Sequence, residues 1–206
     1  MTVERLELDT LDPDPVVQFG RWQRDVVAAE LPEPTAMVLA TAPGGDGAQP
    51  LGRHVLLRGA DEHGFTWVSN HRSVKGRHLA ENPRAALVFP WFAIYRQVVV
   101  AGPVLLAGDD ESDAYFASRP RESQLAAWAS EQSEPIPDRA WIERRWEELA
   151  ERYEGRPVPR PPHWGMYRLV AHRIEFWQQG EHRMHDRFVY ERGAAGEPWR
   201  ITRLAP

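Results

Sequence analysis

The chain has 206 residues, 42% of them hydrophobic and 27% charged, which excludes a largely disordered protein and suits one domain with a sizeable core. Its formal net charge of −5 argues against general binding to nucleic acid or to an anionic membrane, because both need excess positive charge. Cysteine is absent, which excludes disulfides, thiolate metal sites and thiol nucleophiles and fits a reducing cytoplasm.

The N-terminal residues contain acidic side chains and no apolar stretch of the kind found in secretory signals. No apolar run is long enough to predict a transmembrane helix. We expect residues 1–14 to form a flexible tail and residues 15–206 to form a single domain.

Asp14 followed by Pro15 is typical of a helix start, and apolar residues at helical spacing extend this helix to about Glu30. Two apolar runs on either side of a glycine-rich turn then indicate a β-hairpin. The remaining expected elements are, in chain order, strands Met37–Thr41, His54–Leu57 and Phe65–Val68, a helix Ser73–Glu81, strands Ala85–Phe89 and Gln97–Leu106, helices Asp110–Ser118, Glu122–Ser130 and Asp138–Tyr153, and strands Met166–Val170, Ile174–Trp177, Phe188–Arg192 and Trp199–Leu204. This order predicts a mainly β protein of the α+β class, an antiparallel barrel with appended helices.

Motifs for phosphate or metal binding are weak. Neither the dinucleotide fingerprint nor the P-loop spacing occurs, so side chains would have to hold any phosphate. The closest pair of histidines, His182 and His185, is not on an expected helix that would present both to one ion. We therefore expect no metal site.

Basic residues recur at strand ends and turns. Arg53 and Arg58 bracket a strand, Lys75 opens a short helix, Arg119 lies between two helices, and Arg183 follows a turn. Each of them alone is more often a solvated surface residue than a ligand. Taken together, they are consistent with a phosphate-bearing ligand.

Several longer segments occur in a characteristic order: Arg53-His54-Val55-Leu56-Leu57-Arg58, Ser73-Val74-Lys75-Gly76-Arg77, Arg96-Gln97-Val98, Tyr115-Phe116-Ala117-Ser118-Arg119-Pro120, Ala127-Trp128-Ala129-Ser130-Glu131-Gln132-Ser133, Pro161-Pro162-His163-Trp164-Gly165, Ile174-Glu175-Phe176-Trp177 and Arg183-Met184-His185-Asp186-Arg187. By these segments the chain resembles the flavin-dependent pyridoxamine (pyridoxine) 5'-phosphate oxidases. The resemblance runs from about Pro15 to Pro206, nearly the whole chain.

The resemblance implies an FMN-binding split β-barrel that forms a homodimer, with both subunits lining each active site. The implied reaction oxidises pyridoxamine 5'-phosphate or pyridoxine 5'-phosphate to pyridoxal 5'-phosphate, with O2 as acceptor and H2O2 as product. The implied FMN contacts are Arg53, His54, Val55, Leu56, Leu57, Arg58, Val68, Ser69, Lys75 and Gln97, with Gln132, Ser133, Trp177 and Arg187 from the facing subunit.

On the substrate side, the resemblance assigns Tyr115, Arg119 and Ser123 to the phosphate of the substrate, and Arg58 reaches flavin and substrate alike. Arginine suits this role, because its planar fork matches phosphate oxygens. Arg183 and His185 match the catalytic pair that flanks the pyridine ring and its reacting carbon. His185 is of a type that can transfer a proton near neutral pH.

Several positions depart from the family pattern, among them Met184 and the segment Gly180-Glu181-His182. Arg58 replaces a lysine, Val68 an aromatic hydroxyl, and Val74 a basic residue that normally precedes Lys75. Two alternatives to the leading interpretation therefore stay open: a flavin oxidase of the same fold that acts on another aromatic substrate, such as a phenazine precursor, and a non-catalytic flavin- or pyridoxal-phosphate-binding protein. The retained Tyr115 and Arg119 favour the phosphorylated substrate.

Overall fold

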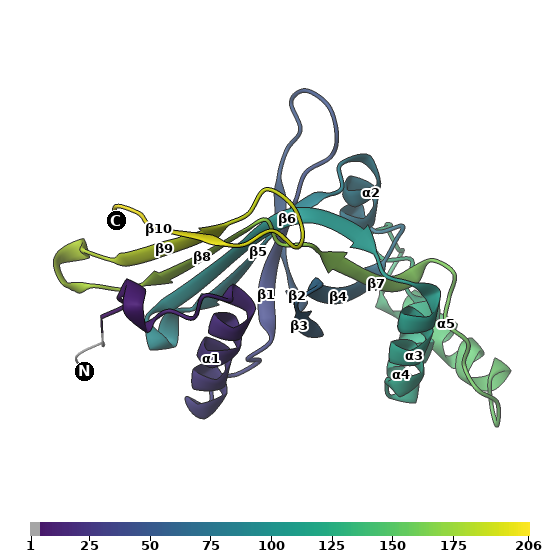
Figure 1. Cartoon of the computed structure of the whole chain (residues 1–206). Helices are drawn as coiled ribbons and strands as arrows, with labels where there is room; N and C mark the ends of the chain where they lie inside the picture. Colours follow the sequence, from purple (N-terminus) through teal and green to yellow (C-terminus); the bar gives the residue numbers. More distant parts are fainter. Residues whose placement is uncertain (1–4) are drawn as a thin grey trace.

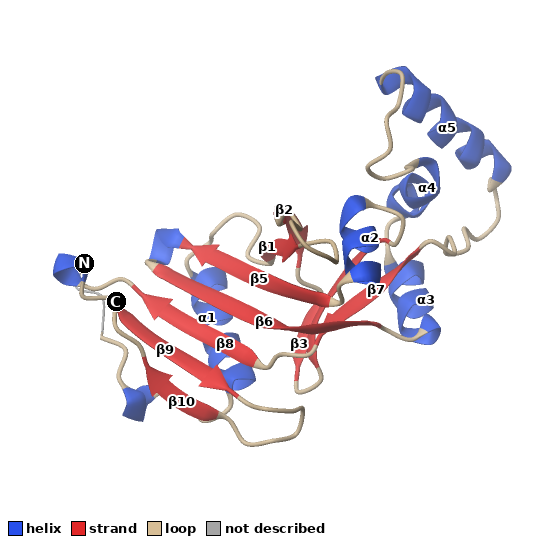
Figure 2. Cartoon of the chain, turned by 90° about the horizontal axis from the view of Figure 1, so that it is seen from above, coloured by secondary structure: helices blue, strands red, loops and turns tan. Residues whose placement is uncertain are grey.

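The computed structural model describes residues 5–206, and its centre is an antiparallel sheet of ten strands. Along the main path the order is β10-β9-β8-β6-β5-β1-β2, while β7, β4 and β3 form a branch that starts from β6 (Figures 1 and 2). The strands are β1 Ala36–Thr41, β2 Leu51–Leu56, β3 Gly59–Asp61, β4 Gly64–Asn70, β5 Arg84–Trp91, β6 Arg96–Leu106, β7 Trp164–Leu169, β8 Arg173–Gln178, β9 Asp186–Glu191 and β10 Arg200–Arg203.

The long strand β6 is where the sheet divides. Its first half pairs with β8 from Arg96 to Ala101, and its last three residues pair with β7 instead. The change of partner falls at Gly102 and Pro103. A Cβ atom on Gly102 would lie 2.0 Å from the carbonyl oxygen of Val170, so only glycine allows this close approach.

One face of the main sheet is covered by helix α1 (Pro15–Ala28), which Asp14 caps by accepting a hydrogen bond from the Val16 N–H (Figure 1). Phe19 and Trp22 of α1 are almost fully buried, and their rings pack edge-to-face on Phe89 and Phe176 of the sheet, respectively. This face is the main hydrophobic core.

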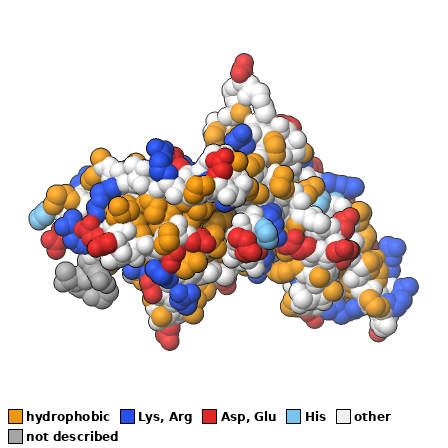
Figure 3. Space-filling view, viewed as in Figure 1, with side chains coloured by type: hydrophobic (Ala, Val, Ile, Leu, Met, Phe, Trp, Pro, Cys, Tyr) orange, Lys and Arg blue, Asp and Glu red, His pale blue; other side chains and the backbone are white. Residues whose placement is uncertain are grey.

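The remaining helices gather at the other end of the molecule, where α4 and α5 project away from the sheet (Figure 2). Buried side chains of Phe116, Leu125, Val158 and Trp164 form a second, smaller core there. In the space-filling view, hydrophobic side chains gather over the strands above α1, whereas charged side chains are frequent at the α3–α5 end (Figure 3). The helices are α2 Val74–Glu81, α3 Asp109–Ser118, α4 Arg121–Ala129 and α5 Arg139–Arg152.

Each expected strand and helix is present within a few residues, and the antiparallel α+β architecture is confirmed. The short strand β3 was not expected, because three residues are too few to show the alternation of apolar and polar side chains that predicts a strand. The expected tail differs as well. Residues 1–4 lie outside the described part of the chain, but Leu6 and Leu11 are buried in the main core, and the Leu6 N–H donates to Asp186 at 3.1 Å.

Candidate functional site

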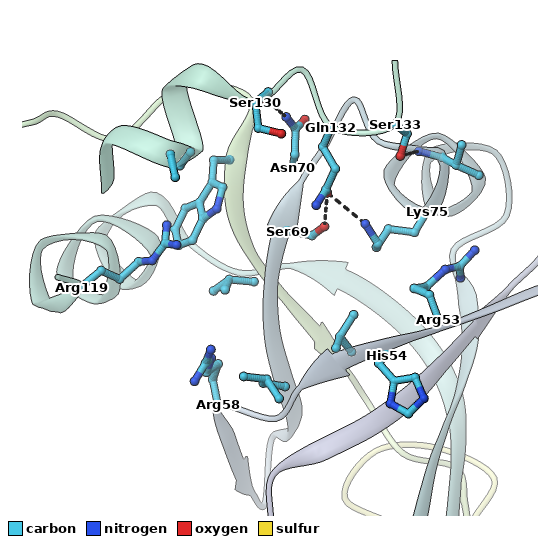
Figure 4. A pocket seen from close by; sticks show the side chains of 17 residues that line it. Arg53, His54, Arg58, Ser69, Asn70, Lys75, Arg119, Ser130, Gln132 and Ser133 are labelled. Carbon is cyan, nitrogen blue, oxygen red and sulfur yellow. Dashed lines mark hydrogen bonds between the residues drawn. The ribbon is translucent and has the colours of Figure 1, made fainter. Parts of the chain in front are cut away.

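A cavity of about 590 Å³ lies between β2, β4, the start of α2 and helix α4 (Figure 4). It brings together eleven of the residues expected from the sequence: Arg53, His54, Val55, Leu56, Arg58, Val68, Ser69, Lys75, Arg119, Gln132 and Ser133. Six more residues complete the lining: Asn70, Val74, Ala126, Ala127, Ser130 and Trp164.

Lys75 reaches this cavity from the first turn of α2. Ser73 caps the helix, and Gly76 is required because a Cβ there would lie 2.1 Å from the His71 carbonyl oxygen. The Lys75 ammonium donates to Gln132 Oε1 at 2.9 Å and to Ser73 Oγ at 3.2 Å. Burial, followed by the nearby charge of Arg53, lowers the pKa of Lys75 to about 8.

Arg53 lies beside Lys75 at the same end of the cavity. Its Nη1 donates to the carbonyl oxygen of Leu39 at 3.0 Å and to the hydroxyl of Thr41 at 2.7 Å. Burial lowers the pKa of Arg53. Within residues 5–206, neither Arg53 nor Lys75 forms an ion pair with a carboxylate, so both positive charges are uncompensated.

A second pair of cations, Arg58 and Arg119, lies on the opposite side of the cavity from Lys75 and Arg53 (Figure 4). The guanidinium carbon of Arg58 lies 5.7 Å from the Tyr115 ring centre, and that of Arg119 lies 4.8 Å from the ring of Trp164. Burial lowers the pKa of Arg119; Tyr115 opposes this shift and the Arg58 charge adds to it.

Arg119 also holds a buried nitrogen atom, Nη1, that has no hydrogen-bond partner among the described residues. A buried donor of a charged group without an acceptor is costly, so this atom calls for an anionic or polar ligand. The whole lining contains four cationic side chains and no carboxylate. The cationic side chains of the cavity therefore lie in two separate pairs.

Five of the other expected site residues form a second group outside this cavity: Gln97, Trp177, Arg183, His185 and Arg187. Tyr115 on α3 does not line the cavity, although its ring centre lies 5.7 Å from the guanidinium carbon of Arg58. Gln97, Trp177 and Arg187 are register partners on β6, β8 and β9, so their side chains form one row across one face of the sheet. The His185 ring centre lies 4.8 Å from that of Trp177, and His185 Nδ1 accepts a hydrogen bond from the Gly180 N–H at 3.2 Å.

Within this second group, Arg187 is paired with a carboxylate. Arg187 donates from Nε and Nη2 to Glu175 Oε1 at 2.9 and 2.7 Å, and Arg173 donates to Glu175 Oε2 at 2.7 Å. Although burial works against ionisation, these arginines hold the pKa of Glu175 below its usual value. Arg183 is exposed and has a left-handed backbone with φ of 66°, next to His182 with φ of 52°.

Four residues lie differently from their expected places. The Leu57 side chain is buried in the main core and does not line the cavity, because it alternates with its neighbours along the chain. Gln132 and Ser133 were expected to act from the facing subunit, but Gln132 bonds Lys75 of its own chain and Ser133 Oγ accepts from the Val74 N–H at 3.3 Å. Ser123 lies in the first turn of α4, outside the lining residues.

Asn70, Ser130 and Trp164 line the cavity without having been assigned a role. Asn70 Oδ1 accepts from the Arg72 N–H at 2.8 Å, and its amide group donates to the Ser130 carbonyl oxygen at 3.4 Å. The spacing of Asn70 and Ser73 at a strand-to-helix turn is a signal that could have pointed to Asn70. Contacts between distant segments, such as Ser130 with Asn70, have no local signal.

Comparison with known proteins matches two family models to the chain. Residues 24–153 match the model described as pyridoxamine 5'-phosphate oxidase. Residues 164–206 match the model described as the pyridoxine 5'-phosphate oxidase C-terminal dimerisation region. Within residues 5–206, no helix is both long and apolar enough to span a bilayer, and no three His, Asp or Glu side chains cluster as a metal site would require.

Among curated proteins, the pyridoxine/pyridoxamine 5'-phosphate oxidase of Rubrobacter xylanophilus is 54% identical over 96% of this chain and 89% of its own length. That of Burkholderia ambifaria is 51% identical over 98% of this chain and 94% of its own length. Among solved structures, PhzG from Burkholderia lata, in complex with tetrahydrophenazine-1-carboxylic acid, has a TM-score of 0.90 and 29% identity, with both chains fully covered. On this sequence and structural similarity, the chain belongs to the pyridoxamine 5'-phosphate oxidase family of oxidoreductases.

Proposed function

We propose that this protein is an FMN-dependent oxidase that converts pyridoxamine 5'-phosphate or pyridoxine 5'-phosphate to pyridoxal 5'-phosphate. O2 is the electron acceptor and H2O2 the second product. The observation that carries this proposal is the cavity with two cationic ends and no carboxylate in its lining. Two such ends suit two phosphate groups, one from a cofactor and one from a substrate.

The residues at the Lys75 end fit the phosphate of FMN. Lys75 and Arg53 supply charge, Ser69 and Ser133 supply hydroxyls, and all four residues line this cavity (Figure 4). A phosphate dianion there would compensate the buried Lys75 and the half-buried Arg53, neither of which has a counter-ion among the described residues. The Arg58 and Arg119 end would hold the substrate phosphate, giving the orphaned Nη1 of Arg119 its acceptor.

The cofactor's contribution is to accept a hydride from the substrate carbon that bears the amine or the alcohol. The alcohol then loses a proton and becomes the aldehyde; the amine becomes an imine, which water hydrolyses to the aldehyde and ammonia. O2 takes up the two electrons and two protons as H2O2. The protein's part is to bind both phosphates and orient the reacting carbon.

His185 is suited to position the substrate. Its Nδ1 accepts a hydrogen bond from the Gly180 N–H, so in the neutral ring Nε2 carries the hydrogen and would donate a hydrogen bond to the substrate. The exposed guanidinium of Arg183, two residues earlier, would lie against the pyridine ring.

We further propose that the active unit is a homodimer with shared sites, in which residues 15–206 of each chain act as one domain. The row of Gln97, Trp177 and Arg187 shares a sheet face with the register partners Val38, Val88 and Val99. These valines are only half-buried, whereas the opposite face is the core. His54, the register partner of Val38, lies on the same face and lines the cavity. A second copy packed on this face would therefore bring its own row to the cavity, and the matched dimerisation region contains β8 and β9.

A second candidate is the oxidation of a phenazine precursor. It is supported by the TM-score of 0.90 and 29% identity to PhzG, whose structure holds tetrahydrophenazine-1-carboxylic acid. The carboxylate of such a precursor could pair with an arginine of the cavity, as a phosphate could. The two ends of the cavity support a phosphorylated substrate, because Arg58 and Arg119 supply a second pair of cations apart from Lys75 and Arg53.

The test is anaerobic reduction of the FMN-loaded protein. We expect the flavin absorbance near its visible maximum to bleach on addition of pyridoxamine 5'-phosphate and to return when O2 is admitted, with H2O2 and pyridoxal 5'-phosphate released. Unphosphorylated pyridoxamine is the matched control and should reduce the flavin far less well. Bleaching by a reduced phenazine carboxylate alone would establish the second candidate, and bleaching by neither would indicate a non-catalytic binding protein.

A further inference from the structure

Arg53 is held from behind by the end of strand β1. Leu39 of β1 is its direct register partner, and Thr41 is the next residue on the same face of that strand. The Thr41 hydroxyl accepts from Arg53 Nη1 at 2.7 Å, and only 3% of Thr41 is exposed. Thr41 is not among the residues that line the cavity, so it does not reach a ligand there.

The Thr41 hydroxyl has a second partner on α2, the helix that carries Lys75. Its oxygen lies 3.2 Å from Nδ1 of His78. Because the hydroxyl oxygen accepts from Arg53, its single hydrogen is free to be donated to His78. Thr41 thus connects the two elements that supply the two cations of this end, β2 through Arg53 and α2 through His78.

The supports of both cations share a property: they carry no charge. Arg53 is held by a carbonyl and a hydroxyl, and Lys75 by the Gln132 amide oxygen and the Ser73 hydroxyl. The two cations repel each other, and this repulsion contributes to the lowered pKa of Lys75. A carboxylate support would hold either group more firmly but would also cancel the charge that attracts an anion. Neutral acceptors fix the position and leave the charge available.

We propose that Thr41 is a positioning residue for phosphate binding: its hydroxyl holds the Arg53 guanidinium in place beside Lys75 without neutralising it. This inference rests on the proposed function, in which the Lys75 and Arg53 end holds the phosphate of FMN. Thr41 acts through Arg53 and touches neither cofactor nor substrate.

The test is a titration of the apoprotein with FMN, followed by quenching of flavin fluorescence. Thr41→Val keeps the shape of the side chain and removes the hydroxyl, and we expect it to raise the Kd for FMN about tenfold, as for the loss of one hydrogen bond to a charged group. Thr41→Ser keeps the hydroxyl and should stay within about twofold of the wild-type value. Should Thr41→Val not fold, as judged by its melting curve, Thr41→Ala carries the same comparison.

A double-mutant cycle separates positioning from a general structural effect. In an Arg53→Met background, Thr41→Val should change the Kd less than about twofold, because the group that it positions is gone. Fully additive effects, or a Thr41→Val variant that binds FMN like the wild type, would overturn the inference while leaving the proposed function intact. A wild-type protein that does not bind FMN would overturn the proposed function, and the role of Thr41 with it.

Discussion

The cavity beside α2 and the open sheet face at β8 and β9 both contain arginine, but they balance its charge in opposite ways. In the cavity, Arg53, Lys75, Arg58 and Arg119 have only neutral partners or none within residues 5–206. On the sheet face, Arg187 and Arg173 share the nearly buried carboxylate of Glu175.

This difference separates groups that await a ligand from groups that are already satisfied within the chain. Uncompensated cations in a preformed cavity are costly until an anion arrives, so they mark a binding site. Arg187 on the sheet face has a carboxylate partner without any ligand, and the row that contains it is free to contact a neighbouring subunit. The two regions are therefore complementary halves of one proposed active site.

The strongest test of this comparison is complementation between subunits. Lys75→Met disables the cavity and Arg183→Ala the sheet-face group, so each variant alone should be nearly inactive. A purified mixed dimer contains one site with both groups intact, and we expect it to recover about half of the wild-type activity. Each variant's own homodimer, purified in parallel, is the control. A mixed dimer no more active than its parents would mean that the two groups do not share a site.

A smaller effect is expected from Arg119→Ala at the substrate end of the cavity. Loss of a charged contact should raise the KM for pyridoxamine 5'-phosphate about 10- to 100-fold, while unphosphorylated pyridoxamine should be affected little. Arg139→Ala on α5, where the side chain is 89% exposed, is the matched control and should leave KM unchanged. Equal KM values for wild type and Arg119→Ala would remove this residue from the site.

The lowered pKa of Lys75 predicts how cofactor binding depends on pH. Lys75 has a pKa of about 8 in the free protein, so at pH 9 it has lost most of its charge and must take up a proton to bind a phosphate. The Kd for FMN should therefore rise about tenfold between pH 7 and pH 9. Lys75→Met should bind more weakly but show a flat profile over this range. A wild-type profile as flat as that of the variant would contradict the assignment.

The smallest effect is expected on the sheet face, at Glu175 of β8. Because the pKa of Glu175 in the folded protein lies below its ordinary value of 4.5, its ion pairs stabilise the fold above that pH and are lost as the pH falls through the lowered value. Glu175→Gln should lower the free energy of unfolding at pH 7 by about 1 kcal/mol, since both arginines are partly exposed to water. The difference from wild type, measured by urea unfolding, should shrink toward pH 3. A difference that stays constant with pH would show that ionisation of Glu175 is not its cause.

The sequence by itself determined the order of the elements and most members of the cavity. Asp14 and Pro15 start α1, the glycine-rich turn joins β1 to β2, and alternating apolar residues predict strands, because these are local effects of capping, turn geometry and side-chain period. The residues of the cavity were recognised because their segments resemble those of a known family, and eleven of them do line it.

Only the tertiary structure decided which residues share a site within one chain. It joined Gln132 to Lys75 across 57 positions of sequence, directed Leu57, Leu6 and Leu11 into the core, and separated Gln97, Trp177 and His185 from the cavity. The supports of Arg53 also became visible only in three dimensions. Pairing between strands and contacts between distant loops depend on the whole packing arrangement, and no local pattern of residues encodes the distance between a hydroxyl on one strand and a guanidinium on the next.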